Sequence, residues 1–121
     1  MGSRSYRDLV VWQKSIALCK VVYLTCESFP RSELYGLASQ MQRAAVSVAS
    51  NIAEGQARQV LGEFRQFLTI ANGSLAELYT QRVIAEELKL IESTRSTELE
   101  ADITEIRKMI YALSAKLETV N

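Results

Sequence analysis

Two cysteines and the lack of histidine limit the reactive chemistry open to this chain. Cys19 and Cys26 could form a disulfide or bind a metal, but seven residues on one helix separate them by about 10 Å along the axis. A disulfide needs Cα atoms within about 7 Å of each other, and this spacing is not a zinc-ligand pattern. We therefore interpret both as small core side chains. The chain has no histidine, which removes the commonest general base and metal ligand.

Motifs of catalytic sites are missing from the sequence. It contains no nucleophile elbow, phosphate loop, zinc motif or dinucleotide-binding fingerprint. Four-helix di-iron proteins use Glu-x-x-His pairs, which cannot occur without histidine. Gly36, Gly55 and Gly73 are isolated within helical patterns and are interpreted as packing or kink positions. We expect no enzymatic activity, no cofactor or metal, and no small-molecule substrate.

Polar side chains form one narrow arc on the second predicted helix. The arc has small hydroxyls and an amide between two arginines, whereas a solvated face usually carries alternating charges. Its members are Gln40, Arg43, Ser47, Ser50, Asn51, Glu54 and Arg58. This mixture suits a recognised ligand or a neighbouring helix, and a solvated face is the alternative.

Apolar residues recur at steps of three and four in four segments, which predicts four helices. The segments are 6–26, 33–57, 61–90 and a last one from a polar turn at 93–97 to about 119. The first is expected to bury Leu9, Trp12, Ile16, Cys19, Tyr23 and Cys26, with Val11, Leu18 and Val22 in a second row. The second is expected to bury Leu34, Leu37, Met41, Ala45, Val48 and Ile52. Ser5 and Ser32 are the expected caps of these two helices.

The last two helices have equally regular stripes. The third is expected to bury Phe64, Phe67, Leu68, Ala71, Leu75, Leu78 and Ala85, and the fourth Leu99, Ile103, Ile106, Ile110, Leu113 and Leu117. No segment alternates as a strand would. Short turns place sequential helices side by side in opposite directions. The sequence therefore predicts an all-α, antiparallel up-and-down four-helix bundle, formed as a single domain from residues 1–121.

The second helix is more apolar than a corner of a monomeric bundle requires. Its apolar positions cover an arc of about 200°, whereas a surface helix needs about 100°. The surplus flank contains Tyr35, Val46, Ala49 and Ala53. We interpret Val46, Ala49 and Ala53 as a candidate subunit interface, and deeper burial inside the monomer is the alternative. Arg82 lies on the apolar face of the third helix, as a snorkelling side chain or in an ion pair between subunits.

Charge gives only a mild indication of partners. Lysine plus arginine and aspartate plus glutamate both number 14, so net charge does not favour nucleic acid or a membrane. Residues 1–60 have a net charge of +3 and residues 61–121 one of −3. No apolar run reaches the roughly 18 residues of a membrane helix, and the start does not have the pattern of a signal peptide. We expect a cytoplasmic protein.

An ordered series of motifs extends over almost the whole chain. It begins with Leu9-x-Val11-Trp12-Gln13-Lys14 and continues through Phe29-Pro30, Glu33-x-Tyr35-Gly36-Leu37, Gln40, Arg43-Ala44-Ala45 and Ser50-Asn51-Ile52-Ala53-Glu54-Gly55. It ends with Glu63-Phe64-x-x-Phe67-Leu68-x-Ile70-Ala71-x-Gly73-Ser74. In this series the chain resembles the 23S rRNA intervening-sequence protein family, also called four-helix bundle proteins. It departs from that pattern at Gln42, where arginine is common, and at Arg82, where leucine is common.

The resemblance implies a homopentamer of antiparallel four-helix bundles without catalytic residues. Genes of this family often lie in sequences inserted into large-subunit ribosomal RNA genes. The accessory protein of diversity-generating retroelements is a similar bundle that binds nucleic acid and a reverse transcriptase. Together with the basic residues around the end of the second helix, this makes Arg43, Arg58 and Arg65 candidate contacts to RNA or DNA. A protein–protein scaffold or adaptor that does not bind nucleic acid is the alternative.

Overall fold

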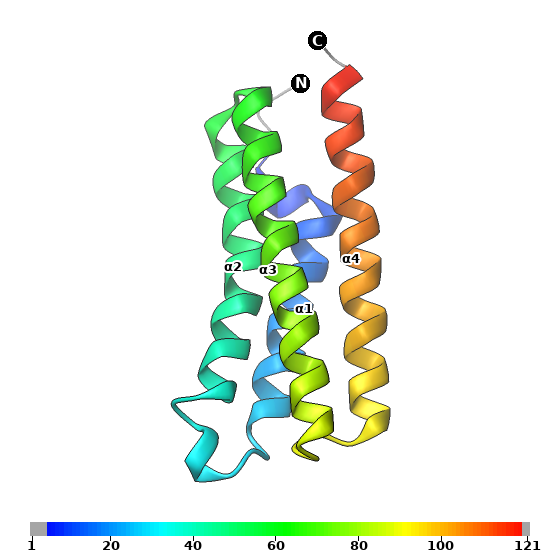
Figure 1. Cartoon of the computed structure of the whole chain (residues 1–121). Coiled ribbons are helices and arrows are strands. Elements are labelled where there is room, and N and C mark those ends of the chain that lie inside the picture. Colours follow the sequence, from blue (N-terminus) through cyan, green and yellow to red (C-terminus); the bar gives the residue numbers. More distant parts are fainter. Residues whose placement is uncertain (1–4, 120–121) are drawn as a thin grey trace.

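A computed structural model of the chain describes residues 5–119 and consists of helices joined by short turns (Figure 1). The four long helices are α1 (Val10–Cys26), α2 (Leu37–Arg58), α3 (Leu61–Glu87) and α4 (Ser93–Thr119). Two short 3-10 helices, Tyr6–Asp8 and Arg31–Glu33, precede α1 and α2. Residues 5–119 contain no strand.

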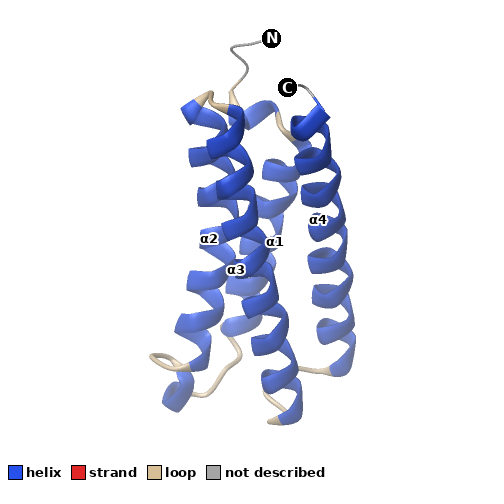
Figure 2. Cartoon of the chain, turned by 45° about the horizontal axis from the view of Figure 1, so that its top comes forward, coloured by secondary structure: helices blue, strands red, loops and turns tan. Residues whose placement is uncertain are grey.

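The helices pack in the order of the chain around one core. Helix α1 contacts α2 and α4, and α3 contacts α2 and α4, while the diagonal pairs make no close backbone contact within the described residues. The described chain begins and ends at the same end of the bundle (Figure 2). The predicted antiparallel up-and-down four-helix bundle is confirmed. The contact between α2 and α3 is the most extensive.

The start of the first helix differs from the prediction. Ser5 accepts a hydrogen bond from the backbone N–H of Arg7 at 3.1 Å, so it caps the 3-10 helix rather than α1. Leu9 is extended, and α1 begins only at Val10. The side chain of Gln13 donates to the carbonyl of Arg7 at 2.7 Å, which fastens the short helix to α1.

Three other helix ends also differ. Helix α2 begins at Leu37, whose N–H donates to the carboxylate of Glu33 at 3.4 Å, so Ser32 is not its cap. Helix α3 ends at Glu87, because Lys89 adopts a left-handed conformation with φ of 60° and Leu90 N–H donates to the carbonyl of Ala85. The segment 93–97, predicted as a turn, forms the first turns of α4.

The core uses the second apolar row of α1 in full and the predicted stripe only in part. Val11, Leu18 and Val22 are buried, and of the predicted stripe Cys26 is buried and Leu9, Trp12 and Cys19 pack half-buried against the core. The prediction is wrong for Ile16 and Tyr23, which are 44% and 46% exposed. The second row was harder to recognise as the centre of the buried face because two polar residues, Ser15 and Thr25, interrupt it. Their hydroxyls donate to backbone carbonyls four residues earlier, at 2.8 and 2.7 Å, and so can be buried.

The stripes of the other helices match the core closely. The predicted residues are buried or half-buried except Leu34, which precedes α2 and is exposed. On α4, Leu99, Ile103, Ile106 and Ile110 are buried, and Leu113 and Leu117 pack against them half-buried. The a/d-like spacing on α4 therefore predicts its packing correctly.

Candidate assembly and nucleic-acid surfaces

Arg58, at the end of α2, is held between two carboxylates. Its guanidinium lies 3.0 Å from Glu54 and 3.3 Å from Glu63, and it stacks over the Phe67 ring at 5.1 Å. Its hydrogen bond to Glu54 and the nearby negative charges raise the pKa of Arg58. Two anionic partners offset its charge, which makes Arg58 a poor contact for phosphate.

The three arginines predicted to bind nucleic acid do not form one site. Arg43 is exposed and has no ion pair or hydrogen bond with residues 5–119. Fifteen residues of α2 place it about 22 Å along the axis from Arg58. Arg65 lies on α3, where its guanidinium donates to the carbonyl of Leu117 at 3.5 Å. Arg65 therefore lies next to the end of α4, and Arg43 lies apart from Arg58 on α2.

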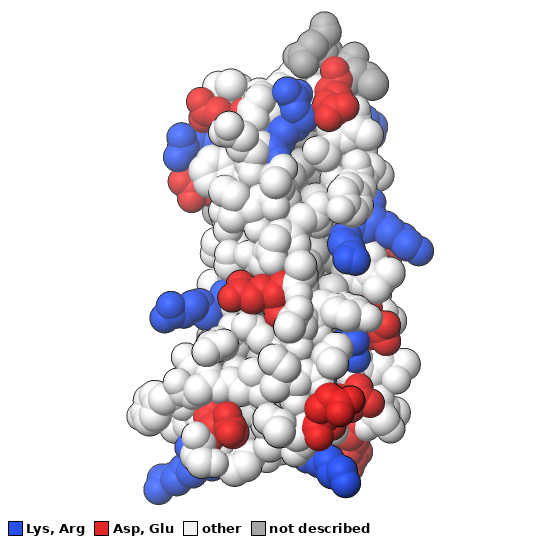
Figure 3. Space-filling model, in the orientation of Figure 1, with Lys and Arg blue, Asp and Glu red and all other residues white. Residues whose placement is uncertain are grey.

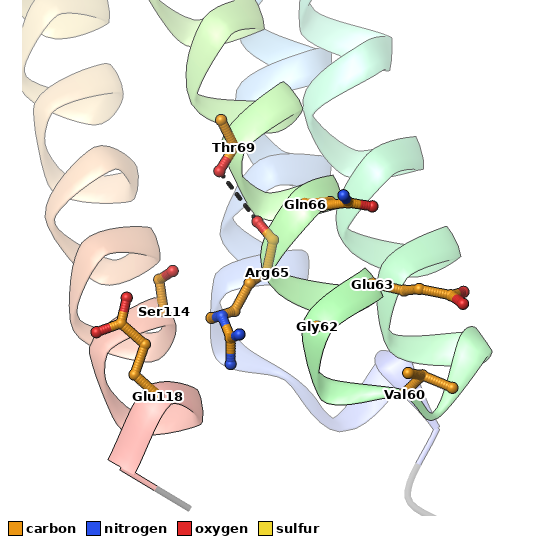
Figure 4. Close-up of a pocket in the computed structure, with 8 residues that line it drawn as sticks. All are labelled: Val60, Gly62, Glu63, Arg65, Gln66, Thr69, Ser114 and Glu118. Carbon is orange, nitrogen blue, oxygen red and sulfur yellow. Dashed lines mark hydrogen bonds between the residues drawn. The ribbon is translucent and has the colours of Figure 1, made fainter. Parts of the chain in front are cut away.

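Arg65 lines an open cleft between the start of α3 and the end of α4. The cleft has a volume of about 530 Å³ and is lined by Val60, Gly62, Glu63, Arg65, Gln66, Thr69, Ser114 and Glu118. Figure 4 shows the Arg65 side chain extending from α3 towards α4, where Ser114 and Glu118 lie on the facing helix. The cleft thus combines one cation with two carboxylates, so it has no net positive charge.

The polar arc of α2 is partly used inside the bundle. Ser47 and Ser74 share a hydrogen bond of 2.7 Å between α2 and α3. Asn51 donates to the carbonyl and the hydroxyl of Ser47 at 2.8 and 3.0 Å. Ser47 therefore bonds to a neighbouring helix of the same chain and Asn51 bonds within α2, whereas Gln40 and Ser50 are exposed.

The candidate interface residues of α2 differ in how much surface they offer. Ser47 marks the flank of α2 that faces α3, and Ala49 lies about 200° around the helix from it, on the side of α1. Ala49 is only 5% exposed and belongs to the packing within the chain. Val46 is exposed and Ala53 is half-buried, so these two can contact another molecule.

The apolar stripe of α1 that the core does not use lies beside this flank. Lys14 forms an ion pair of 3.2 Å with Glu105 of α4, which marks the α4 side of α1. Ile16 lies about 200° around the helix from Lys14, towards α2. We define the α1–α2 surface as the six uncharged residues Trp12, Ile16, Cys19, Tyr23, Val46 and Ala53. The two surplus apolar stripes of the sequence therefore meet on one face of the bundle.

A second apolar surface runs along the outside of α3. We define the α3 strip as Ile70, Gly73, Val83 and Ile84, all exposed. Figure 3 shows uncharged surface along most of this face, interrupted by an acidic side chain near the middle. No atom of the chain outside the helix's own backbone lies within 4 Å of a Cβ built on Gly73. The packing of the single chain thus gives no reason for glycine at this position.

Arg82 is fixed within its own chain. It is 5% exposed, and its guanidinium donates to the Ser96 hydroxyl at 2.6 Å, lies 3.6 Å from Glu86 and stacks on the Tyr79 ring at 4.5 Å. Ser96 in turn donates to Glu86 at 2.6 Å. Arg82 therefore neither snorkels to solvent nor needs a second subunit for its ion pair, and it joins α3 to α4.

The cysteines are free thiols and have the properties of packed side chains. Cys26 is buried, Cys19 is half-buried, and burial raises the pKa of both, that of Cys26 to about 11. Residues 5–119 contain no group of three or more histidine, cysteine, aspartate or glutamate side chains that could hold a metal ion. Within the same range, no helix is long and apolar enough to cross a membrane.

Sequence analysis missed two neighbouring cations on α4. Arg107 and Lys108 make no ion pair or hydrogen bond with the residues that the structure describes. Figure 3 shows cationic side chains projecting midway along the α4 side of the molecule. The signal in the sequence is local, because four acidic residues at 98–105 precede this basic pair on the same helix.

These features define an antiparallel four-helix bundle with uncharged outer surfaces. The chain belongs to the family described as 23S rRNA-intervening sequence protein, whose profile matches residues 7–112. It is also similar to the crystal structure of a protein of unknown function from the S23 ribosomal protein family of Bacteroides thetaiotaomicron. The TM-score is 0.79 at 23% identity, over 87% of this chain and 98% of the other. A search of curated proteins gives no match.

Proposed function

We propose that this protein is a non-enzymatic, self-associating helical bundle that acts as an accessory protein for RNA or DNA. It would act as one domain in the cytoplasm, where ribosomal RNA is made. The observation that carries self-association is the α1–α2 surface. Its residues Ile16, Tyr23 and Val46 are exposed, and Trp12, Cys19 and Ala53 beside them are half-buried. Large exposed apolar patches on soluble proteins commonly mark contacts with other molecules.

A closed ring is the assembly that we propose, with five subunits as the resemblance implies. A cyclic ring needs two different complementary patches on each subunit, whereas a two-fold dimer needs one that pairs with itself. The α1–α2 surface and the α3 strip supply two such patches. The exposed polar residues Arg43, Ser50 and Glu54 of α2 separate them.

Binding of nucleic acid is supported by the family and by unpaired cations. The name of the family refers to an intervening sequence of 23S rRNA. Arg43 is exposed and unpaired, and Arg65 reaches into the cleft between α3 and α4. A ring would repeat such weak contacts around one assembly and raise their joint affinity.

A scaffold or adaptor for another protein is the second candidate. The net charge of zero favours it, because affinity for nucleic acid comes largely from neutralised phosphates. The two ion pairs of Arg58 favour it as well.

Light scattering of the purified chain at micromolar concentration tests the assembly. We expect wild type to have the mass of an oligomer. Ile16→Glu and Val46→Glu should each dissociate the oligomer while circular dichroism still shows helix. Burying an unpaired carboxylate in the contact would be costly, whereas in the monomer both positions are exposed. Ala49→Glu is unsuitable, because Ala49 is buried in the single chain.

Ala17→Glu is the matched control for Ile16→Glu. It adds the same charge to the next residue of α1, which is about 100° away around the helix and is also exposed. We expect this variant to keep the wild-type mass. A monomeric wild type, or equal dissociation by Ala17→Glu, would contradict the proposed interface.

Retention of labelled single-stranded RNA at low salt tests the nucleic-acid role. We expect wild type to bind and the triple change of Arg43, Arg58 and Arg65 to glutamine to weaken binding. The effect should come from Arg43 and Arg65, and Arg58→Gln alone should bind as wild type because its charge is already paired. If wild type binds neither RNA nor DNA at 25 mM salt, the scaffold function replaces this one.

A further inference from the structure

Charge is unevenly distributed along α4. Its first half contains one cation, Arg95, and the acids Glu98, Glu100, Asp102 and Glu105, whereas its second half contains Arg107, Lys108 and Lys116 and one acid, Glu118. Three of the acids already have partners: Glu98 pairs with Arg95 at 3.4 Å, Glu100 accepts from Tyr79 at 3.1 Å, and Glu105 pairs with Lys14 at 3.2 Å. The acidic half is thus largely used within the fold.

The cations just after this acidic half are available to a ligand. Arg107 and Lys108 have no partner among residues 5–119, and Glu105, the nearest acid in sequence, is paired with Lys14 of α1. Tyr111 follows one helical turn later and is 62% exposed. Of the unpaired cations in the described chain, these two are sequence neighbours and have a large exposed aromatic ring one turn away.

Helical spacing places this group at the edge that α4 shares with α3. Glu100 bonds to Tyr79 of α3, and Ser114 lines the cleft that contains Arg65 of α3. Arg107 lies seven residues, or about two turns, from each of them, so it lies on the same flank of α4. Arg107, Tyr111 and Ser114 then follow each other at steps of four and three, over a rise of about 10 Å. Ser114, the last of the three, lies opposite Arg65 in the cleft (Figure 4).

We propose that Arg107, Lys108 and Tyr111, with Arg65, form a binding strip for single-stranded nucleic acid. The cations would neutralise phosphates, and the Tyr111 ring would stack on an unpaired base. This inference rests on the proposed nucleic-acid function and names its site and its type of ligand.

The geometry favours a single strand over a duplex. Tyr111 projects from the outer face of a helix, where its ring is open to solvent. In a duplex the faces of the bases are stacked on one another and are not accessible to such a ring. Stacking on single-stranded bases is also tolerant of sequence, because every base has a π face.

Fluorescence anisotropy with a labelled 20-nucleotide oligo(U) RNA tests the strip in the full chain. At 50 mM salt we expect Arg107→Gln/Lys108→Gln to weaken binding about tenfold. The slope of log K against log salt should fall by about 1.4, since each phosphate contact on a single strand contributes about 0.7. Tyr111→Leu should weaken binding at least about fivefold with an unchanged slope, because it removes stacking and no charge.

Two further variants make the test specific. Lys20→Gln/Arg31→Gln removes two other exposed, unpaired cations, which lie on α1 and in the α1–α2 connection, and should bind within about twofold of wild type. Glu118→Gln removes a carboxylate from the cleft and should strengthen binding. Circular dichroism should show the same melting temperature within a few degrees for all of these variants, because their positions are exposed or, for Arg107, half-buried.

The outcomes separate this inference from the function on which it rests. If wild type binds oligo(U) and the Arg107/Lys108 and Tyr111 variants bind equally well, the strip is refuted while the nucleic-acid function remains. If Tyr111→Leu has no effect and duplex RNA binds as well as oligo(U), stacking on a single strand is refuted. Equal binding of polyglutamate would show a site for acidic polypeptides instead. If wild type does not bind, both proposals fail.

Discussion

Buried polar side chains in this protein act mainly as joints between helices. Arg82 contacts Ser96, Glu86 and Tyr79, which tie α3 to the start of α4. The buried ion pair of Arg82 with Glu86 needs further hydrogen-bond partners, because desolvating two charges costs several kcal/mol per ion. The sequence places Arg82 on the apolar face correctly, but its partners depend on how α4 folds back against α3. For that reason the sequence alone left its role open.

Asp102 gives the clearest dependence on pH. Desolvation raises the pKa of its carboxyl, and the neighbouring Glu105 and Glu98 raise it further, against the opposing effect of Lys14. The folded protein thus binds this proton more tightly than the unfolded chain, and the charged form opposes folding above the folded pKa. We expect Asp102→Asn to raise the melting temperature at pH 7. The gain should shrink as the pH falls and vanish below about 3.8, the ordinary pKa of the group.

Thermal unfolding followed by circular dichroism between pH 3 and pH 8 measures this effect. Thr104→Asn is a control at a nearby half-buried position without charge. An Asp102→Asn variant that is less stable than wild type at pH 7 would mean that its carboxylate has a favourable partner.

At the scale of single helices, the sequence predicts helix α4 better than helix α1. Apart from Ser96 near its start, the buried residues of α4 are aliphatic, so its seven-residue pattern is unambiguous. Helix α1 has two apolar rows, and the row that looks more continuous is only partly buried, with Ile16 and Tyr23 exposed. Hydroxyls that bond to their own helix made the buried row look polar. Periodicity therefore detects an apolar face but does not say whether the core or another molecule covers it.

The candidate site residues also divide into those that the sequence predicts and those that only the structure reveals. Val46 and Ala53 were predicted as interface candidates because a surplus apolar arc can be recognised in the sequence alone. The pairing of Arg58 with Glu63 was not, because the turn between α2 and α3 brings these residues together. The unpaired state of Arg107 and Lys108 depends likewise on Glu105 turning to Lys14 of another helix.

Close approach of α2 and α3 explains one glycine and gives a prediction about packing. A Cβ on Gly55 would lie 2.7 Å from Cβ of Phe67 and 3.0 Å from the ring of Phe64. Gly55→Ala should therefore lower the free energy of unfolding by about 1–3 kcal/mol, as overpacking does in other cores. Urea unfolding measures it, with Gly62→Ala as control, since a Cβ on Gly62 would meet nothing within 4 Å beyond its chain neighbours and its own helix backbone. A variant as stable as wild type would show that the two helices separate easily.

At the scale of the whole molecule, surplus apolar surface is the main feature that the single chain does not explain. The charges balance at 14 of each sign, so repulsion between copies is weak. Two uncharged surfaces on different sides of the bundle are what the closed ring that we propose would require. In such an assembly each subunit would present the same cationic edge of α4, and weak single contacts would act together.

A substitution at Gly73 should affect the stability of the single subunit and the stability of the assembly in opposite directions. A glycine within a helix costs about 0.5–1 kcal/mol relative to alanine, and no nearby atom of the chain forbids a Cβ at Gly73. Gly73→Ala should therefore raise the free energy of unfolding of the isolated bundle. This is to be measured in a background that carries Ile16→Glu, which keeps the bundle monomeric. In the otherwise wild-type chain the added methyl should hinder a neighbouring helix on the α3 strip and weaken the oligomer, as measured by light scattering on dilution. Gly62→Ala, in the first turn of α3 and also open, should leave the mass unchanged. If Gly73→Ala strengthens the oligomer together with the subunit, the α3 strip is not one of the two ring surfaces.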